Sequence, residues 1–224
     1  MATTKITFSA QKDGTGYSIV AGSKTVKTPA GKPLKYPNKT MAEKTVAQMT
    51  DHGLDAPFYR LMSFARDMER QKLEQELLEH FDTDLVCYFA DAPADLVAWQ
   101  QRHWQPVLDW AKQEGIAPVK TTQHTSPLTQ PDEAKKALSE HLASLTPTQF
   151  VAAFIAGKLS SSVLTGLAFT KGYLSPQTAH AVAHADELYQ QKRYGEDAEL
   201  TKNLAEAQSQ LEQLALFTGL AANG

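Results

Sequence analysis

Cysteine is scarce in this 224-residue sequence, which contains only Cys87. A single cysteine excludes an internal disulfide framework and any zinc or iron–sulfur site built from several cysteines. The sequence also has no uninterrupted apolar run of the ~18–20 residues that a membrane helix needs. Its first residues, MATTK, lack the apolar stretch of a signal peptide. We therefore expect no membrane insertion and a cytoplasmic location in a bacterium, or the mitochondrial matrix for a processed eukaryotic form.

Neither sign of charge is in large excess, because 22 basic residues face 25 acidic ones and the formal net charge is −3. A dedicated nucleic-acid binder has a dominant basic face, so no nucleic-acid partner is expected. The total nevertheless hides an asymmetry. Residues 1–48 carry +6, whereas the rest of the chain carries −9. This difference indicates two structural units with different surfaces.

Motifs of nucleotide-binding and nucleophilic sites are missing. The glycines at 14–16 and the Gly-Lys pair at 31–32 lack the spacing of a phosphate-binding loop and its Ser or Thr after the lysine. The serine run at 160–162 has no nucleophile-elbow pattern. Cys87 lies in an apolar run, which favours a buried structural thiol over a reactive one. We therefore expect a non-enzyme without cofactor or metal.

Two small groups of polar residues could still carry chemistry. His180 and His184 are four residues apart on an expected helix, so they could share a metal with a nearby carboxylate. The glutamate that follows the first histidine of a zincin motif is missing, since Ala181 is there. Asp82 and Asp84 could form a carboxylate pair, but we interpret them as a helix end leading into a loop. A small metal-dependent hydrolase that uses the histidine pair is kept as an alternative function.

The first part of the chain is typical of β-hairpins. Short alternating segments at 5–9, 17–20 and 24–28 are separated by glycine-containing turns. Prolines then recur every four residues from 29 to 37, which forbids a helix and favours an extended edge. Because three or four short strands cannot fold stably alone, this sheet must pack against another part of the chain.

From residue 38 onward the apolar spacing becomes helical. Asn38 or Thr40 can cap a first helix, and a long helix is expected over 56–81. Pro93 opens a helix with three tryptophans, at least one of them near the surface, and Pro106 inside it predicts a kink or a new start. Further helices are expected after residues 131, 146 and 175, where proline or a capping residue gives a start signal.

Small residues and a leucine seam mark the last third of the chain. Glycines at 157, 166 and 172 allow helices to cross closely in a buried core. The last helix should lie along the bundle through a seam in which the spacing alternates between four and three residues. Pairing of two copies through this seam would instead give a dimerising structural or adaptor protein. The seam consists of Leu200, Leu204, Ala207, Leu211 and Leu214.

Together these patterns predict an α+β fold. A small β-rich N-terminal domain that includes the first helix should span residues 1–50. A larger all-helical C-terminal domain should span residues 51–224. We expect this protein to be a monomer.

Several strings, in this order along the chain, resemble the ATP synthase assembly chaperones that bind the alpha subunit, the ATP-twelve family. KTPAGKPL at 27–34 resembles the N-terminal signature of that family, and TDLVCY at 83–88 resembles its central string. The tryptophan-rich segment at 98–111 and the segment DELYQQKRYGED at 186–197 resemble the two that follow. The resemblance implies a β-rich N-terminal domain followed by a helical domain, and an assembly factor rather than an enzyme.

The function implied by this resemblance is surface contact with a protein client. Such a chaperone binds the unassembled alpha subunit of the F-one head, shields its apolar interface and is displaced by the beta subunit. A functionally sensitive acid of the family precedes its Trp-Gly string, which by position is Asp186 or Glu187 here. Solvated helix residues are the alternative interpretation of both acids. The partner-binding residues that the resemblance implies are Asp186, Glu187, Tyr194, Gly195 and Asp197.

Overall fold

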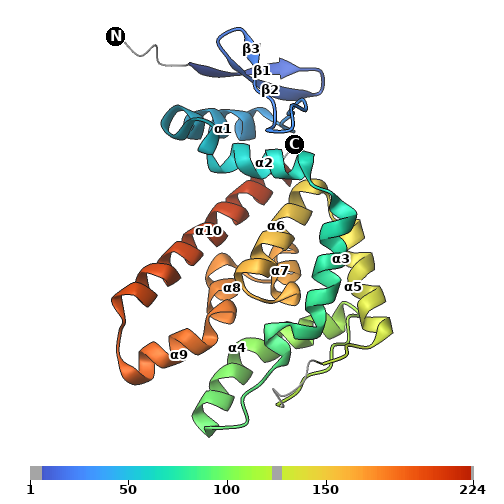
Figure 1. Ribbon diagram of the computed structural model, residues 1–224, viewed down its shortest axis with the longest axis vertical. Coiled ribbons are helices and arrows are strands. Elements are labelled where there is room, and N and C mark those ends of the chain that lie inside the picture. The colour runs from blue at the N-terminus through green and yellow to red at the C-terminus, as the bar shows by residue number, and fades with distance from the viewer. Residues whose placement is uncertain (1–6, 123–127, 223–224) are drawn as a thin grey trace. The chain divides into compact units, whose positions relative to one another are not determined.

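The computed structural model describes residues 7–122 and 128–222 and divides into two compact units (Figure 1). Unit 1 contains the chain up to Glu69 together with the segment from Leu216 onward, and unit 2 contains Arg70–Ala215. A three-stranded sheet near the N-terminus is followed by helices, which confirms the predicted α+β class. Within the described ranges we find no helix with the length and apolar character of a membrane span.

The sheet of unit 1 is an antiparallel meander in the order β1-β2-β3. Its turns lie where the sequence predicts them, at Gly14 (φ 64°) and Gly22 (φ 62°), because glycine accepts this left-handed backbone without strain. Ala10 on the first strand pairs with Ile19 on the second, and Ile19 is buried. The strands are β1 (Phe8–Asp13), β2 (Gly16–Ala21) and β3 (Lys24–Thr25).

The proline-spaced segment after β3 is extended, as predicted. Tyr36 exchanges backbone hydrogen bonds of 2.9 and 2.8 Å with Tyr17, which adds a bridge beside β2. Between β3 and Tyr36 the chain makes a turn in which Gly31 N–H donates to Thr28 O at 2.8 Å. Gly31 has φ 76°, a conformation that favours glycine.

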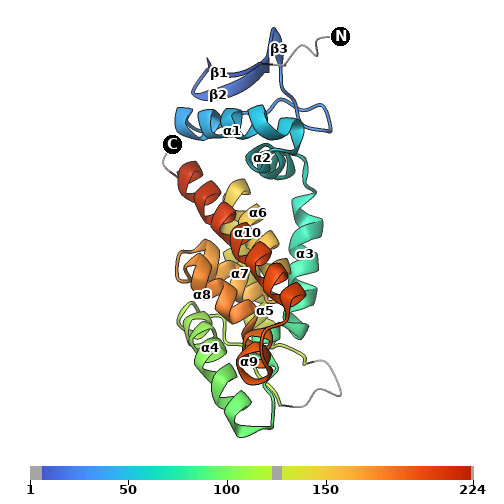
Figure 2. The ribbon, with the colours of Figure 1, turned by 90° about the vertical axis from the view of Figure 1, so that its left-hand side faces the viewer.

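Two helices and the end of the last helix complete the core of unit 1. Figures 1 and 2 both show the strands lying over α1 (Lys39–His52), which contacts β1 and β2. A short turn, η1 (Gly53–Asp55), leads into α2 (Pro57–Asp67). The Phe58 ring of α2 meets the Phe217 ring edge-on, with centroids 5.5 Å apart. The buried residues of this core are Ile19, Val26, Leu34, Tyr36, Met41, Ala42, Met49, Ala56, Phe58, Tyr59, Met62 and Phe217.

This core explains why the unit boundary differs from the expected one at residue 50. Met49 and Phe58 lie on either side of that position and belong to the same buried cluster. Asn38 ties the two ends of the chain together, because its Nδ2 donates to Leu220 O at 2.6 Å. The small sheet therefore packs on two helices and a C-terminal segment, which supply the apolar surface that three strands lack.

Unit 2 is built from helices and short turns. The helix expected over 56–81 is interrupted at Met68, whose ψ of 145° leaves helical geometry without a proline or glycine to announce it. Pro106 does not divide its helix, which is continuous across that position. The elements are α3 (Arg70–His80), η2 (Phe81–Thr83), η3 (Leu85–Cys87), α4 (Ala94–Gln113), α5 (Asp132–Ser144), α6 (Pro147–Leu159), α7 (Val163–Thr170), α8 (Pro176–Ala183), α9 (Ala185–Tyr194) and α10 (Ala198–Ala222), whose last residues belong to unit 1.

The centre of unit 2 is the close crossing of α6 and α7, as the embedded glycines predict. Residues 163–169 of α7 are all buried. A Cβ on Gly166 would lie 2.4 Å from Ala153 O and 2.5 Å from Gly157 N, so only glycine fits there. The predicted leucine seam on α10 faces the interior, since Leu204, Leu211 and Leu214 are buried. These leucines are therefore not available for pairing with a second copy.

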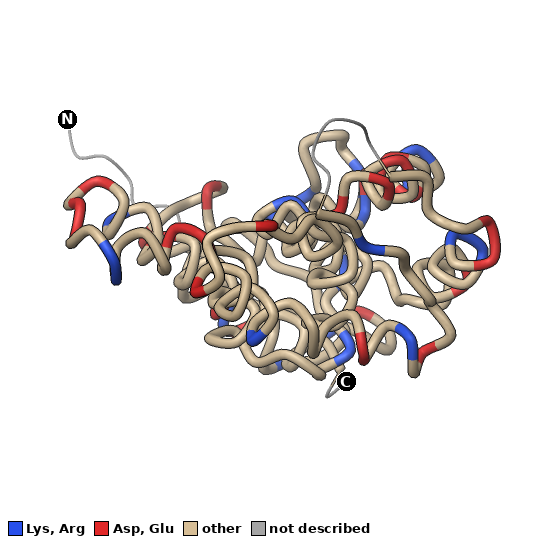
Figure 3. Tube along the Cα trace, turned by 90° about the horizontal axis from the view of Figure 1, so that it is seen from below, with Lys and Arg blue, Asp and Glu red and all other residues tan. Residues whose placement is uncertain are grey.

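The charge asymmetry follows the two units. Residues 1–48, which carry +6, all belong to unit 1. The same unit also contains four acids, Asp51, Asp55, Asp67 and Glu69, and two arginines, Arg60 and Arg66, so its net charge is +4 and that of unit 2 is −7. Figure 3 shows basic and acidic positions interspersed along the traced chain. Neither sign therefore occupies one uninterrupted stretch of the trace.

Candidate functional site

Two tryptophans of α4 hold the backbone around the start of α9. Trp99 Nε1 donates to Ala185 O at 2.8 Å, and Trp104 Nε1 donates to Val182 O at 3.0 Å. Trp104 is buried, whereas Trp99 is only partly buried, as expected for one of the three tryptophans. Amphipathic indole rings suit this position, because the ring packs while its N–H finds a carbonyl. These bonds fix the start of α9 against α4.

Asp186, in the first turn of α9, is oriented by a buried amide. Gln100 Nε2 donates to Asp186 Oδ1 at 2.8 Å. Gln100 is 3% exposed, and its own Oε1 accepts from Ala90 N at 2.7 Å, so the amide cannot easily turn. Asp186 is therefore a partly buried carboxylate in a fixed orientation, rather than a freely solvated helix residue.

Asp186 and Tyr194, two of the five predicted partner-binding residues, line one surface depression of about 320 Å³. Tyr194 is 77% exposed, which is unusual for a large ring. A depression with apolar walls, exposed aromatic surface and one charge has the composition of a protein-contact site. Its lining residues are Pro93, Leu96, Asp186, Tyr189, Gln190 and Tyr194.

Arg193 organises the two tyrosines of this depression. Its guanidinium forms an ion pair with Asp95 and donates to the Tyr189 hydroxyl at 2.9 Å. It also lies 5.9 Å from the Tyr189 ring centroid and 5.7 Å from that of Tyr194. The Tyr189 hydroxyl and the guanidinium hold the pKa of Asp95 below its usual range. Arg193 is thus already engaged by an anion and by both rings.

Glu187 has a different set of neighbours from Asp186. Its Oε1 lies 3.9 Å from His184 Nδ1, and interaction with this imidazole lowers the pKa of the Glu187 carboxyl. Glu187 is not among the residues that line the depression. The sequence leaves open which of the two acids matters, and the structure distinguishes them by placement.

Gly195 and Asp197 shape the turn between α9 and α10. Gly195 has φ 99°, and its N–H donates to Gln191 O at 3.0 Å, which ends α9. Asp197 Oδ1 accepts from Leu200 N at 2.8 Å and so caps the start of α10. Neither residue lines the depression. The hydrogen bonds of both residues shape the backbone between α9 and α10.

The histidine pair of the alternative hydrolase is integrated into the packing. The rings of His180 and His184 lie 4.9 Å apart, and His180 Nε2 donates to Leu204 O at 2.9 Å. Burial, together with the neighbouring His184, lowers the pKa of His180. No group of three His, Cys, Asp or Glu side chains within 7–122 and 128–222 is arranged to hold a metal.

The carboxylates Asp82 and Asp84 point to different partners. Asp82 Oδ2 pairs with Lys135 Nζ at 2.8 Å on α5. Asp84 is completely buried, and its Oδ2 accepts from Leu164 N at 3.0 Å at the start of α7. Each carboxylate is held in a separate structural contact, so the two do not form a catalytic pair.

Sequence reasoning missed the α4 wall of the depression and Tyr189. Pro93 and Leu96 lie about ninety residues before α9, and no local pattern connects them to it. Tyr189 could have been found, because it is three residues after Asp186 and so shares its helical face. Gln100, which orients Asp186, lies in the tryptophan-rich segment that carried part of the family resemblance.

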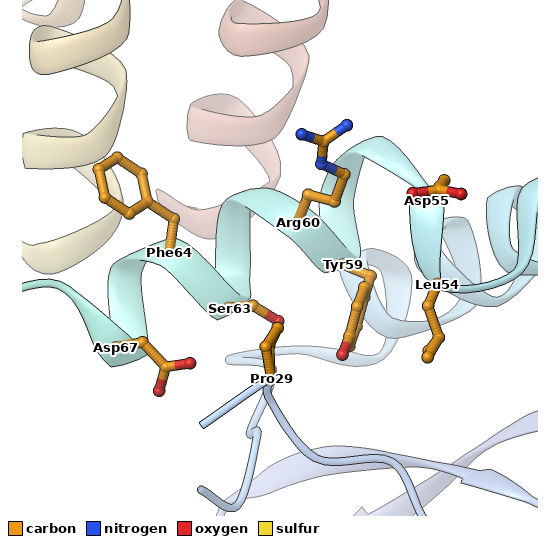
Figure 4. Close-up of a pocket in the computed structure, with 8 residues that line it drawn as sticks. All are labelled: Pro29, Leu54, Asp55, Tyr59, Arg60, Ser63, Phe64 and Asp67. Atoms are coloured by element: carbon orange, nitrogen blue, oxygen red, sulfur yellow. The ribbon is translucent and has the colours of Figure 1, made fainter. Parts of the chain in front are cut away.

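A second depression, of about 470 Å³, lies in unit 1 (Figure 4). Its polar groups mainly attach the 27–32 turn to α2, since Tyr59 Oη donates to Lys27 O at 2.8 Å and Thr28 Oγ1 donates to Asp67 Oδ1 at 2.9 Å. No predicted site residue lies in it. The lining residues are Pro29, Leu54, Asp55, Tyr59, Arg60, Ser63, Phe64 and Asp67.

Comparison with solved structures extends over nearly the whole chain. The fold is similar to that of Atp12 from Paracoccus denitrificans, with 27% identity, a TM-score of 0.83 and 96% of each chain covered. An Asp-to-Lys mutant of the same organism's Atp12p matches with 26% identity and a TM-score of 0.84, covering 96% of this chain and 95% of that one. The Atu1473 protein of Agrobacterium tumefaciens, a candidate chaperone, matches with 27% identity and a TM-score of 0.86, covering 98% and 85%.

The sequence itself matches a family model over its N-terminal half. That model is described as ATP12 chaperone protein and matches residues 3–112, a range that runs from the sheet of unit 1 through most of α4. The solved structures extend the likeness through α10. The two-unit fold, the resembling strings and these matches agree, and the chain belongs to the ATP12 chaperone family.

Proposed function

We propose that this protein is an assembly chaperone for ATP synthase that binds the unassembled alpha subunit of the F-one head. It shields the apolar interface of that subunit and is displaced when the beta subunit arrives. The observation that carries the proposal is the match to Atp12 over 96% of the chain. In this account the protein acts as a cytoplasmic monomer, needs no cofactor and catalyses no reaction.

The physics of such a function is surface contact. An unassembled subunit exposes apolar surface that would otherwise aggregate. A chaperone must cover that surface and still leave, so a modest interface with a few aromatic anchors suits it better than a large apolar one. The depression between α4 and α9 supports this role, because Tyr194 is 77% exposed beside an oriented carboxylate, Asp186.

Co-expression with the alpha subunit of the same organism tests the proposal. We expect the chain to raise the amount of soluble alpha subunit and to elute with it as a one-to-one complex in size exclusion with light scattering. The account fails if the alpha subunit is as insoluble with the chain as without it and no complex elutes.

A surface variant links this complex to the described depression. Tyr194→Ala should weaken the complex about tenfold or more, since exposed aromatic anchors typically contribute 1–2 kcal/mol or more to binding. The fold should be unaffected, because Tyr194 is largely exposed. Val119→Ala, which shortens a 40% exposed apolar side chain outside the depression, serves as the control. Equal affinity of both variants would remove this depression from the client interface.

A further inference from the structure

One carboxylate is the only charge in the lining of the depression between α4 and α9. Among its six lining residues, Asp186 alone is ionisable at neutral pH, and no cation is included. Gln100 occupies Asp186 Oδ1, whereas no described residue donates to Oδ2. A partly buried carboxylate oxygen without a donor is a strong acceptor for a charged hydrogen-bond donor.

The basic residues nearest to Asp186 in the sequence, Lys192 and Arg193, interact with other groups. Arg193 pairs with Asp95 and bonds the Tyr189 hydroxyl. The Lys192 ammonium lies over the Trp99 ring, 4.9 Å from its centroid. Neither lines the depression, so the charge of Asp186 is not cancelled by a cation within it.

The remaining walls suit the stem and face of a basic side chain. Tyr189 and Tyr194 offer aromatic faces, which attract guanidinium groups, and Arg193 already lies within 6 Å of both ring centroids. Pro93 and Leu96 supply apolar contact for a methylene stem or a neighbouring residue. A volume of about 320 Å³ is at the small end for a ligand pocket, which fits one side chain better than a cofactor.

We propose that this depression receives a basic side chain, arginine foremost, from the protein client, with Asp186 Oδ2 as its acceptor. The inference rests on the proposed function, because it names what the client presents to this surface. Asp186 then determines specificity by charge, and Gln100 positions it. Glu187, which faces His184, has no part in this contact.

The test uses the full-length protein and a matched pair of small probes. N-acetyl-arginine amide is titrated into ¹⁵N-labelled protein and followed by amide chemical shifts, with N-acetyl-citrulline amide as the uncharged probe of the same shape. We expect saturable shifts within α4 and α9 in the millimolar range for the arginine probe, and at least tenfold weaker binding of citrulline. Absence of saturable shifts, or equal binding of both probes, overturns the proposal.

A variant of the acceptor separates charge from structure. Asp186→Asn keeps an oxygen that can accept from Gln100, so it should fold normally while losing arginine binding by tenfold or more. Glu196→Gln removes an exposed acid that does not line the depression and should bind like the original protein. Unchanged binding by Asp186→Asn contradicts the assignment.

The same variants distinguish this inference from the proposed function. The probe titration contains no alpha subunit, so arginine binding without an alpha-subunit complex would leave the site intact and make the proposed client wrong. A stable alpha-subunit complex that Asp186→Asn leaves unchanged would instead retain the client and overturn the arginine contact.

Discussion

Replacing Gly166 with alanine should destabilise unit 2 by about 3 kcal/mol or more, although alanine is the better helix former. The added Cβ would lie 2.4 Å from Ala153 O, 2.5 Å from Gly157 N and 2.8 Å from Gly157 Cα. All three are backbone atoms of α6, so the clash can be relieved only by moving one helix away from the other. Because α7 is buried throughout residues 163–169, such a movement would open the core.

Urea unfolding followed by far-ultraviolet circular dichroism measures this effect. Gly219→Ala is the control, because a Cβ there meets nothing within 4 Å and the substitution should be neutral or stabilise α10 by up to ~1 kcal/mol. If Gly166→Ala unfolds within 1 kcal/mol of the original protein, the close crossing of α6 and α7 is contradicted.

Replacing Asp84 is the second change with a large expected effect. Its carboxylate accepts from Val86 N at 3.3 Å and from Leu164 N at 3.0 Å, which joins η3 to the start of α7 across 80 residues of sequence. Asp84→Ala leaves these buried donors without an acceptor and should cost about 3 kcal/mol or more. Loss of less than 1 kcal/mol in the same urea measurement would argue against the contact.

The stability contributed by Asp84 should also depend on pH. Burial raises the pKa of Asp84 to about 6 in the folded protein, against roughly 3.9 for an unperturbed aspartate. Between these values the folded state binds the proton more tightly, so stability from this group falls as pH rises from about 4 to 6 and is constant above. Asp84→Asn cannot titrate there, so the stability of the original protein relative to this variant should fall by about 3 kcal/mol over that window. A difference that is flat or rises with pH would contradict this.

Local signals in the sequence predicted the helix starts well. Asn38, Thr146 and Ser175 each accept the expected backbone hydrogen bond at the start of a helix. The break at Met68 was not predictable, because the residue has normal helix propensity and no proline or glycine adjoins it. Local patterns also could not predict which segments form unit 1, because Phe217 reaches its core from the other end of the chain.

Only the part of the candidate site that lies on α9 was predictable from the sequence. Asp186 and Tyr194 were identified through the family resemblance, whereas Pro93 and Leu96 are brought to them by tertiary packing of α4 on α9. The string at 83–88 that also supported the resemblance has a structural explanation, because it contains the buried Asp84. A family string can therefore indicate the fold without marking the contact surface.

The central claim is that this protein occupies the alpha-subunit surface that the beta subunit later covers. The most direct measurement adds purified beta subunit to the isolated complex of this chain with alpha subunit and follows the species by native mass spectrometry. The account predicts release of the free chain as alpha–beta assemblies appear, in proportion to the beta subunit added. A stable complex that contains all three proteins, or a chain that stays bound while beta remains free, would contradict it.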